Sequence, residues 1–376
     1  MNIEDKRMKV MHIIHGFPIG GAEVLVKEYC SYIDRNKFDI VVLCFDRYDT
    51  QLEKCVLELP IKIHFISDYY KYSFSRKGKL MMLVERLFIA KRIVRKEKPD
   101  IIHSHLTLNY LVRFCKPSKS TLLIHTVHNE PKVMWKKTFS RQMDLYAAKW
   151  LVKRYKQRFI ALHDSMRLEI NRLFSVHNTI VLNNGIDFSK FVISNEKSLI
   201  RERLQIPQEA FVIGNIGRFE KQKNHTFLID VFNEIYKKNN NAYLLLVGAG
   251  LLHSEIVNKI KSLGLEAQCK ILSNRTDIPE ILEAMDIFCF PSQFEGLGIV
   301  LIEAQKMGVK CVTSDKIPSA AIVSNQIVQL SLNEIPTEWA RYILNFNGEE
   351  IRYFNIEEWD IKNVVKRLEN IYENKI

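Results

Sequence analysis

Apolar residues occur along this chain in two alternating patterns. Short runs rich in β-branched residues predict buried strands, and longer stretches with an apolar residue every three or four positions predict amphipathic helices. In the first half the predicted strands are 9–14, 40–44, 62–66, 101–105, 122–127 and 159–162, with helices such as 22–33 and 80–96 between them. This alternation is typical of α/β proteins that have a parallel sheet.

The same plan repeats in the second half. The predicted strands are 211–216, 242–247, 269–272, 287–291 and 311–313, and the predicted helices are 224–238, 251–263, 278–285 and 299–307. The repetition predicts two facing Rossmann-like domains with a cleft lined by the loops after the strands. We place the domains at 1–190 and 191–356, with a polar linker at 183–198, and we expect a last helix at 357–376 to rejoin the first domain.

The composition is that of an ordinary globular enzyme, and the 376 residues suffice for two domains. The seven cysteines have no CxxC spacing, which argues against a zinc site or a disulfide framework. The polar start lacks the apolar core of a signal peptide, and no run reaches the roughly 18 apolar residues of a membrane span. We therefore expect a cytoplasmic protein.

The net charge of +12 is unevenly distributed. Residues 1–190 hold 34 lysines and arginines against 19 acidic residues, whereas the remainder holds 21 against 24. The segment 132–158 mixes this charge with aromatic residues, which fits either a helix lying on an anionic membrane surface or a solvated basic face over an ordinary core. Nucleic acid is a weaker alternative, because no recognised binding motif accompanies the charge.

Two loops carry residues suited to binding an anion. Gly20 and Gly21 stand where the first strand runs into a helix, and glycines there let backbone N–H groups approach an anion. Arg218 and Lys223 follow the first strand of the second half, where a planar fork and a mobile point charge could together hold a diphosphate. Taken alone, the glycine pair also fits a tight turn and the two cations fit surface charge.

The segment 290–304 is the most informative, because it reads as a strand, a glycine loop and an apolar helix. The N–H groups of Gly298 and Ile299 would open that helix and could hold phosphate oxygens. Glu295 belongs to the loop, whereas Glu303 lies about one turn into the apolar helix. A carboxylate there needs a partner, which could be a sugar hydroxyl or a nearby lysine or arginine.

Together these residues resemble retaining glycosyltransferase family 4 of the GT-B fold, and in particular its bacterial capsule and exopolysaccharide enzymes. The resemblance rests on Arg218 with Lys223 and on Glu295 and Glu303 in an E-x7-E arrangement. It extends over nearly the whole chain through KPDIIHSH (98–105), HTVHN (125–129), NGID (184–187), VGAG (247–250) and EGLGIVLIEA (295–304). Gly298 departs from the family, in which close relatives often have proline at this position.

The resemblance implies a role for each matching residue. Arg218 and Lys223 would bind the donor diphosphate and stabilise it as the leaving group. Glu303 would hold the ribose hydroxyls, and Glu295 would hold those of the transferred sugar. Gly298 and Ile299 would contact the donor at the start of their helix.

In the first domain, the resemblance implies that Gly20 and Gly21 close over the diphosphate and that His128 faces the sugar. The neighbouring His103, His105 and His125 are expected to be structural. Asp164 and Asp187 are expected to position loops. Such enzymes need no metal or other cofactor, and the chain shows no convincing Asp-x-Asp motif.

The predicted function is therefore a retaining, metal-independent hexosyltransferase. It would move a sugar from a nucleotide diphosphate, which we expect to be UDP, to a glycan or polyprenyl-diphosphate-linked saccharide. We expect a cytoplasmic protein that can associate with the inner face of the cell membrane. The alternatives are a sugar-nucleotide epimerase of related fold and a non-catalytic partner of another transferase. A nicotinamide-dependent oxidoreductase is disfavoured, because the glycine fingerprint with its acidic residue is absent.

Overall fold

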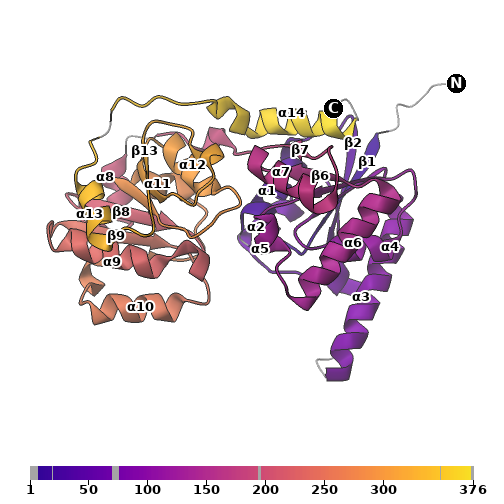
Figure 1. Ribbon diagram of the computed structural model, residues 1–376, viewed down its shortest axis with the longest axis horizontal. Coiled ribbons are helices and arrows are strands. Elements are labelled where there is room, and N and C mark those ends of the chain that lie inside the picture. Colours follow the sequence, from indigo (N-terminus) through magenta and orange to yellow (C-terminus); the bar gives the residue numbers. More distant parts are fainter. Residues whose placement is uncertain (1–6, 19, 70–75, 194–195, 348, 374–376) are drawn as a thin grey trace. The chain divides into compact units, whose positions relative to one another are not determined.

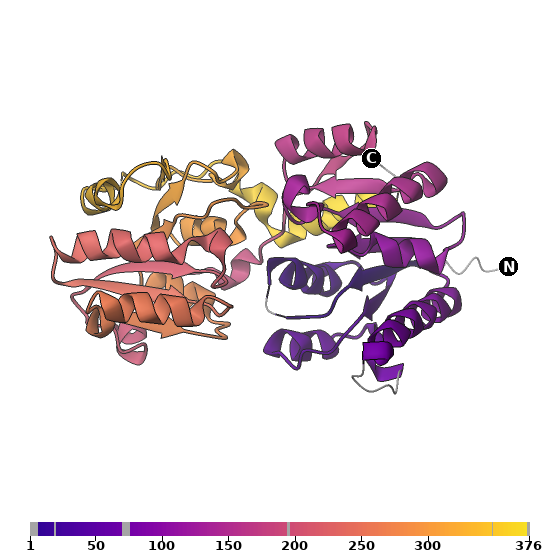
Figure 2. The same cartoon turned by 60° about the horizontal axis from the view of Figure 1, so that its bottom comes forward.

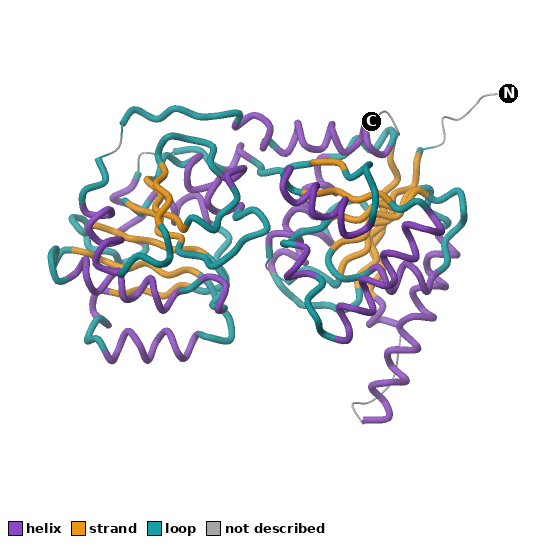
Figure 3. The backbone as a smooth tube through the Cα atoms, viewed as in Figure 1, coloured by secondary structure: helices purple, strands orange, loops and turns teal. Residues whose placement is uncertain are grey.

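The computed structural model describes residues 7–18, 20–69, 76–193, 196–347 and 349–373. The chain forms two compact units, of which unit 1 comprises Met1–Gly185 with Glu358–Ile376 and unit 2 comprises Ile186–Glu357. The boundary falls inside the segment in which the sequence predicts the linker. In each unit, strands form a central sheet with helices packed around it (Figure 3).

Unit 1 is built on a seven-stranded sheet in the order β3-β2-β1-β4-β5-β6-β7, and all its strand pairs are parallel. The strands are β1 (Met8–Ile14), β2 (Phe38–Cys44), β3 (Lys62–Phe65), β4 (Ile101–His105), β5 (Leu122–Thr126), β6 (Arg158–Ala161) and β7 (Ile180–Val181). Helices cover both faces of a parallel sheet, which is why its central strands read as continuous apolar runs. The two-residue β7 is too short to leave such a pattern, and the sequence analysis missed it.

The sheet of unit 1 separates two apolar cores, one on each of its faces, and the helices cover them. These helices are α1 (Gly21–Tyr32), α2 (Gln51–Leu57), α3 (Arg76–Glu97), α4 (Asn109–Cys115), α5 (Pro131–Met134), α6 (Phe139–Tyr155), α7 (Asp164–Phe174) and α14 (Ile361–Tyr372). Among the described residues, no helix is both long and apolar enough to cross a membrane.

The last helix, α14, packs on α1 although more than 300 residues separate the two in sequence (Figure 1). Its buried side chains include Ile361, Val364, Leu368 and Ile371, which recur at the spacing of one helix face. Asp360 caps its start by accepting a hydrogen bond from the backbone N–H of Lys362. The helix is shorter than the predicted 357–376, because a 3-10 turn occupies Ile356–Trp359 and residues 374–376 lie outside the described part.

Unit 2 has a six-stranded parallel sheet in the order β10-β9-β8-β11-β12-β13, shown from a second direction in Figure 2. The strands are β8 (Phe211–Ile216), β9 (Ala242–Val247), β10 (Cys269–Leu272), β11 (Ile287–Phe290), β12 (Lys310–Ser314) and β13 (Ile327–Leu330). The helices are α8 (Lys197–Arg203), α9 (His225–Tyr236), α10 (His253–Ser262), α11 (Ile278–Glu283), α12 (Ile299–Lys306) and α13 (Pro336–Leu344). The sequence analysis missed α8, α13 and the edge strand β13. In β13 only Leu330 is buried, and Gln329 is exposed.

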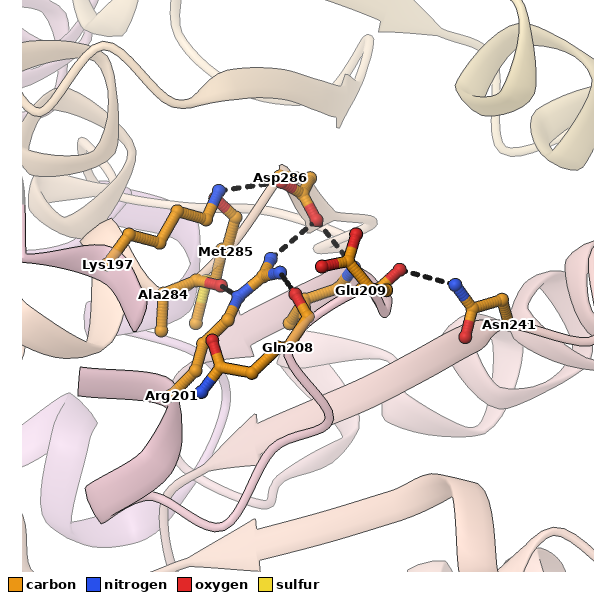
Figure 4. A network of polar contacts seen from close by, with 9 residues as sticks. Lys197, Arg201, Gln208, Glu209, Asn241, Ala284, Met285 and Asp286 are labelled. Carbon is orange, nitrogen blue, oxygen red and sulfur yellow. Dashed lines mark hydrogen bonds and ion pairs between the residues drawn. The ribbon is translucent and has the colours of Figure 1, made fainter. Parts of the chain in front are cut away.

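A polar network fixes α8 against the amino ends of β8 and β11 (Figure 4). Asp286 accepts hydrogen bonds from Lys197 at 2.6 Å, from Arg201 at 2.8 Å and from the backbone N–H of Val212 at 2.8 Å. Arg201 is only 6% exposed and also donates to the carbonyl oxygens of Ala284 and Gln208. This network lies at the edge of the sheet opposite the loops that carry the candidate chemistry.

Candidate functional site

In unit 2 the candidate residues lie on loops at the carboxyl ends of the strands, where ligands bind to such sheets. Arg218 follows β8 and is exposed, and its guanidinium lies 3.2 Å from the carboxylate of Glu220. Lys223 ends the short 3-10 turn Lys221–Lys223, and its aliphatic carbons pack over Gly217. Its ammonium lies 4.7 Å from the ring centroid of Phe290, at the end of β11, so a cation–π contact holds it toward the second loop.

The lysine joins the two loops through Glu295. The Nζ atom of Lys223 lies 2.7 Å from Oε1 of Glu295, and both side chains are mostly buried. Gln222 donates to the other carboxylate oxygen at 3.2 Å and to the carbonyl oxygen of Phe294 at 2.9 Å. The loop after β8 and the loop after β11 are therefore fixed to each other by charged and amide groups. A lysine ammonium has three N–H donors, so Lys223 can keep its bond to Glu295 and still contact a phosphate.

Gly298 sits beside this pair at the start of α12. Its φ of 88° is in the left-handed region, where glycine carries no steric penalty. Proline is restricted to a φ near −65°, so the proline that close relatives often have at this position could not adopt the turn seen here. Gly298 and Ile299 place the helix N-terminus next to Glu295, whose Cγ would lie 3.7 Å from a Cβ atom on Gly298.

Glu303 lies on α12 in largely apolar surroundings and is half-buried. Among the described residues, none donates a hydrogen bond to its carboxyl group or forms an ion pair with it. Burial raises the pKa of this carboxyl group from 4.5 to about 7, because water no longer stabilises the charged form. The sequence analysis left open whether a nearby lysine or arginine pairs with Glu303. No such partner is found among the described residues, so the carboxyl group remains available for a ligand.

In unit 1, Gly20 is the N-cap residue of α1 and Gly21 is its first residue. Gly20 has an extended backbone, and the carboxylate of Glu23 in the first turn of the helix folds back over it. A carboxylate is favourable at a helix N-terminus, since the helix dipole and the N–H groups attract negative charge. A phosphate bound here would have to share this helix end with Glu23.

His128 follows β5 and contacts a second histidine. Its Nε2 atom lies 3.0 Å from Nδ1 of His105, a fully buried residue on β4. Burial lowers the pKa of His128 to about 4, so its imidazole is neutral at physiological pH. His103 bonds Tyr372 and Thr126, and His125 bonds Ser104 and approaches Asn109, as structural histidines do.

The structure adds three residues that the sequence analysis missed. Gln222 bonds Glu295, and His12 on β1 bonds His105. His225 begins α9 beside Lys223 and is 1% exposed, and neither of its ring nitrogens has a partner among the described residues. A polar residue at the start of an apolar helix was the available signal for His225. For His12, the signal was a histidine inside a strand that is otherwise apolar.

Two family models match this chain, one in each half. A family model described as "Glycosyltransferase Family 4" matches residues 19–190, and one described as "Glycosyl transferases group 1" matches residues 196–346. This chain is a glycosyltransferase. The two models divide the glycosyltransferase sequence as the structure divides it, with one match in each unit.

Two relatives align over almost their entire length. An Escherichia coli protein named UDP-Gal:alpha-D-GlcNAc-diphosphoundecaprenol alpha-1,3-galactosyltransferase is 23% identical, over 99% of this chain and 98% of its own. The Staphylococcus aureus capsular polysaccharide biosynthesis glycosyltransferase CapH is 25% identical, over 98% of this chain and 99% of its own. The crystal structure of Anabaena HepE in complex with UDP and glucose has a TM-score of 0.72 at 19% identity, over 97% of this chain and 95% of that one.

These findings confirm two predictions, namely two parallel-sheet Rossmann-like domains of GT-B type and glycosyltransferase activity. The epimerase and the non-catalytic partner are not favoured, because the relatives are named as glycosyltransferases. The residue roles stay predictions from the resemblance.

Proposed function

We propose that this glycosyltransferase moves a hexose from a UDP-sugar to a lipid-linked saccharide and retains the anomeric configuration. The observation that carries the proposal is the Lys223–Glu295 pair, held beside the N-terminus of α12 at the carboxyl ends of β8 and β11. Cationic, hydroxyl-accepting and anion-binding groups are thereby gathered at one edge of one sheet. UDP is proposed because the Escherichia coli relative is named for UDP-Gal and HepE was crystallised with UDP and glucose.

Each group has a distinct task in the proposal. Arg218 and Lys223 hold the diphosphate and stabilise the charge that develops as the glycosidic bond breaks. Glu295 accepts hydrogen bonds from hydroxyls of the sugar, and Glu303 accepts them from the ribose. In unit 1 we assign Gly20 and Gly21 to a contact with the diphosphate through backbone N–H groups, and His128 to a contact with the donor sugar.

The proposed reaction uses no protein nucleophile. The acceptor hydroxyl attacks the anomeric carbon on the face from which the diphosphate departs, and a phosphate oxygen takes the hydroxyl proton. The protein contributes orientation and fixed positive charge. We propose that the reaction is metal-independent, because Arg218 and Lys223 supply the charge that a divalent cation would otherwise provide.

Point variants in the loop after β8 test the assignment. Arg218→Ala and Lys223→Ala should each lower kcat by about 100-fold or more, the size expected when a transition-state charge partner is removed. Lys221→Ala is the matched control, since Lys221 is exposed in the same turn and should leave turnover unchanged. Wild-type turnover in both test variants, with unchanged melting temperatures, would overturn the assignment.

Two further measurements separate the alternatives. Incubation with the UDP-sugar alone should leave the sugar unepimerised, whereas an epimerase would convert it without any acceptor. With an acceptor present, NMR of the product should show the anomeric configuration of the donor, and EDTA should not reduce the rate. An inverted product would refute the same-face mechanism, and loss of turnover in EDTA would refute metal independence.

We propose that the acceptor is a polyprenyl-diphosphate-linked saccharide used in making capsule or another surface polysaccharide, and that unit 1 reaches it at an anionic membrane surface. One face of α6 exposes Phe139, Met143 and Tyr146, which are 85%, 51% and 67% exposed and recur at helical spacing. The same helix carries Lys153 and Arg154 in its last turn. Exposed apolar side chains near basic residues suit the interface between lipid headgroups and acyl chains.

Liposome flotation tests the membrane contact. The wild-type protein should float with vesicles of mixed zwitterionic and anionic lipid at low salt and not with purely zwitterionic vesicles. The double variant Phe139→Ser with Tyr146→Ser should lose most of this binding. Leu251→Ser is the control, because Leu251 is 96% exposed but belongs to unit 2. No flotation on either lipid mixture would favour a solvated basic face and a soluble acceptor, and equal flotation on both would refute the dependence on anionic lipid.

A further inference from the structure

Three histidines of unit 1 form a chain that ends at His128. Nδ1 of His12 lies 3.0 Å from Nε2 of His105, and Nδ1 of His105 lies 3.0 Å from Nε2 of His128. The rings belong to β1, to β4 and to the loop after β5. Each imidazole is joined to the next in the same sense, Nδ1 to Nε2, so the chain has a direction.

Both ends of the chain are buried ring nitrogens. Nε2 of His12 and Nδ1 of His128 have no hydrogen-bond partner among the described residues. The His12 end is enclosed by aromatic rings, since Tyr29 and Tyr372 have their centroids 6.3 and 6.5 Å from the imidazole. His128 is the only one of the three that is partly exposed, so a ligand could reach the chain only at its His128 end.

All three imidazoles are neutral. Burial lowers the pKa of His12 to about 3 and that of His128 to about 4, and burial together with the other histidines lowers the pKa of His105 well below its usual range. The titratable groups that face the chain are histidines and tyrosines, with His103 and His125 beside His105 and with Tyr29 and Tyr372 around His12. No carboxylate among the described residues contributes to the shifts of the three chain members.

Neutrality couples the three tautomers. A neutral imidazole has one N–H and one lone pair, so each link needs a donor on one side and an acceptor on the other. Both links are satisfied only if all three protons are on Nδ1 or all three are on Nε2. Any other arrangement makes two N–H groups or two lone pairs face each other at 3.0 Å. The tautomer of His12 therefore determines that of His128, although the two residues do not bond each other.

The closed end decides between the two arrangements. With the protons on Nε2, His12 would bury an N–H donor that has no acceptor. With the protons on Nδ1, His12 leaves only a lone pair unused, which is the less costly defect at a closed end because unpaired buried acceptors are commoner than unpaired donors. The N–H that is left over then belongs to His128, the partly exposed end, where an oxygen of a ligand can accept it. The second arrangement places an N–H on Nδ1 of His128.

We infer that His12 and His105 are positioning residues, which fix His128 as a neutral hydrogen-bond donor through its Nδ1–H. Such a donor suits an electronegative oxygen of the donor sugar or its diphosphate, and it cannot act as a general base through that nitrogen. The catalytic consequence rests on the proposed function, in which His128 contacts the donor sugar. The coupling of the three tautomers does not depend on that proposal.

The alternative is that this histidine cluster binds a metal ion. Ring nitrogens of His12, His103 and His105 lie within 4.8 Å of one another. However, both nitrogens of His103 already lie 2.7 Å from hydroxyl oxygens, of Tyr372 and Thr126. An ion would have to displace these bonds and the His12–His105 link, and no carboxylate belongs to the cluster. The hydrogen-bonded chain requires none of these bonds to be displaced.

The test is 15N NMR of the full-length protein with labelled histidine, in which the shifts of the two ring nitrogens report the tautomer. His128 is assigned by its loss in His128→Gln. In the wild type His128 should be fully in the Nδ1–H form. In His12→Phe it should become a mixture of tautomers, although His12 does not bond His128. Tyr372→Phe is the control, since it keeps the ring and removes a hydroxyl that, among the described residues, bonds His103 and none of the three chain members, and it should leave the tautomer unchanged.

Activity provides the second measurement. His12→Phe should lower kcat by about threefold to tenfold with little change in KM, because part of the His128 population then presents a lone pair to the substrate. A mixed tautomer in the wild type, or an unchanged tautomer in His12→Phe, would overturn the inference, as would a shift of these signals on adding zinc. A changed tautomer with unchanged kcat would uphold the chain and refute the proposed contact of His128 with the sugar.

Discussion

Glu303→Gln should make the protein more stable and less able to bind its donor. Burial raises the pKa of the Glu303 carboxyl group from 4.5 to about 7. Between these values the folded protein keeps a proton that the unfolded chain has released. The free energy of unfolding of the wild type therefore falls as the pH rises through this window and stays low above it. Glutamine has nearly the same shape and carries no charge, so the free energy of unfolding of the variant does not fall in this way as the pH rises.

The magnitude follows from the size of the pKa shift. Each pKa unit corresponds to about 1.4 kcal/mol, so the charged carboxylate costs about 3 kcal/mol at pH 8.5 and less than about 1 kcal/mol at pH 5. The stability advantage of Glu303→Gln should thus grow by about 2.5 kcal/mol between pH 5 and pH 8.5. For a domain of this size, that is a change of roughly 5–10 °C in the melting-temperature difference.

Thermal melts of the wild type and the variant at both pH values measure this difference. Glu349→Gln is the matched control, because the Glu349 side chain is 74% exposed in the same unit and should show no such trend. A stability difference between wild type and Glu303→Gln that is the same at pH 5 and pH 8.5 would refute the reasoning, since it would show that no charge is being buried.

Donor binding should respond in the opposite direction. A carboxylate can accept hydrogen bonds from two ribose hydroxyls, so the ionised form of Glu303 is the binding form. At pH 6 only about a tenth of a group with a pKa near 7 is ionised, and the affinity for UDP-glucose should therefore be up to about tenfold weaker at pH 6 than at pH 8. Calorimetry should show weaker binding and no such pH dependence in Glu303→Gln. If both proteins bound UDP-glucose with equal affinity at pH 8, Glu303 would not be part of the donor-binding site.

Three further predictions concern stability, and denaturation by urea measures each. Asp286→Ala should cost about 3 kcal/mol, because it leaves the buried guanidinium of Arg201 without its carboxylate; a loss below about 1 kcal/mol would contradict this. Gly298→Ala should cost about 1 kcal/mol, because alanine is strained at a φ of 88°, whereas an unchanged midpoint would show that the turn relaxes. Asp360→Ala should cost about 1 kcal/mol through loss of the cap of α14, and Asp360→Asn should restore most of it.

Much of the fold could be read from the sequence, because a strand buried on both faces needs a continuous apolar run and a helix on a sheet needs one apolar face. The missed elements are those in which this constraint is weak. The edge strand β13 alternates little between buried and exposed residues, and α8 is held by the polar network of Asp286 as well as by apolar contacts. Polar networks leave no periodic pattern in the sequence.

The candidate site was readable where chemistry and backbone conformation restrict residue choice. Glycines at helix starts, cations after a strand and a carboxylate in an apolar helix each stand out against their surroundings. The pairing of Lys223 with Glu295 was not readable, because 72 residues separate them and only the parallel order of β8 and β11 brings their loops together. The role of Gln222 between the loops was missed for the same reason.

The sequence by itself determined the alternating architecture, the division into two units and the family of this glycosyltransferase, since these depend on apolar periodicity and on motifs that are local in the chain. The tertiary structure decided the state of the ionisable groups. Glu303 and His128 titrate outside their usual ranges because burial removes water from them, and burial is a property of the packed fold. The chain from His12 through His105 to His128 likewise exists only because adjacent strands of the sheet bring three distant histidines into contact.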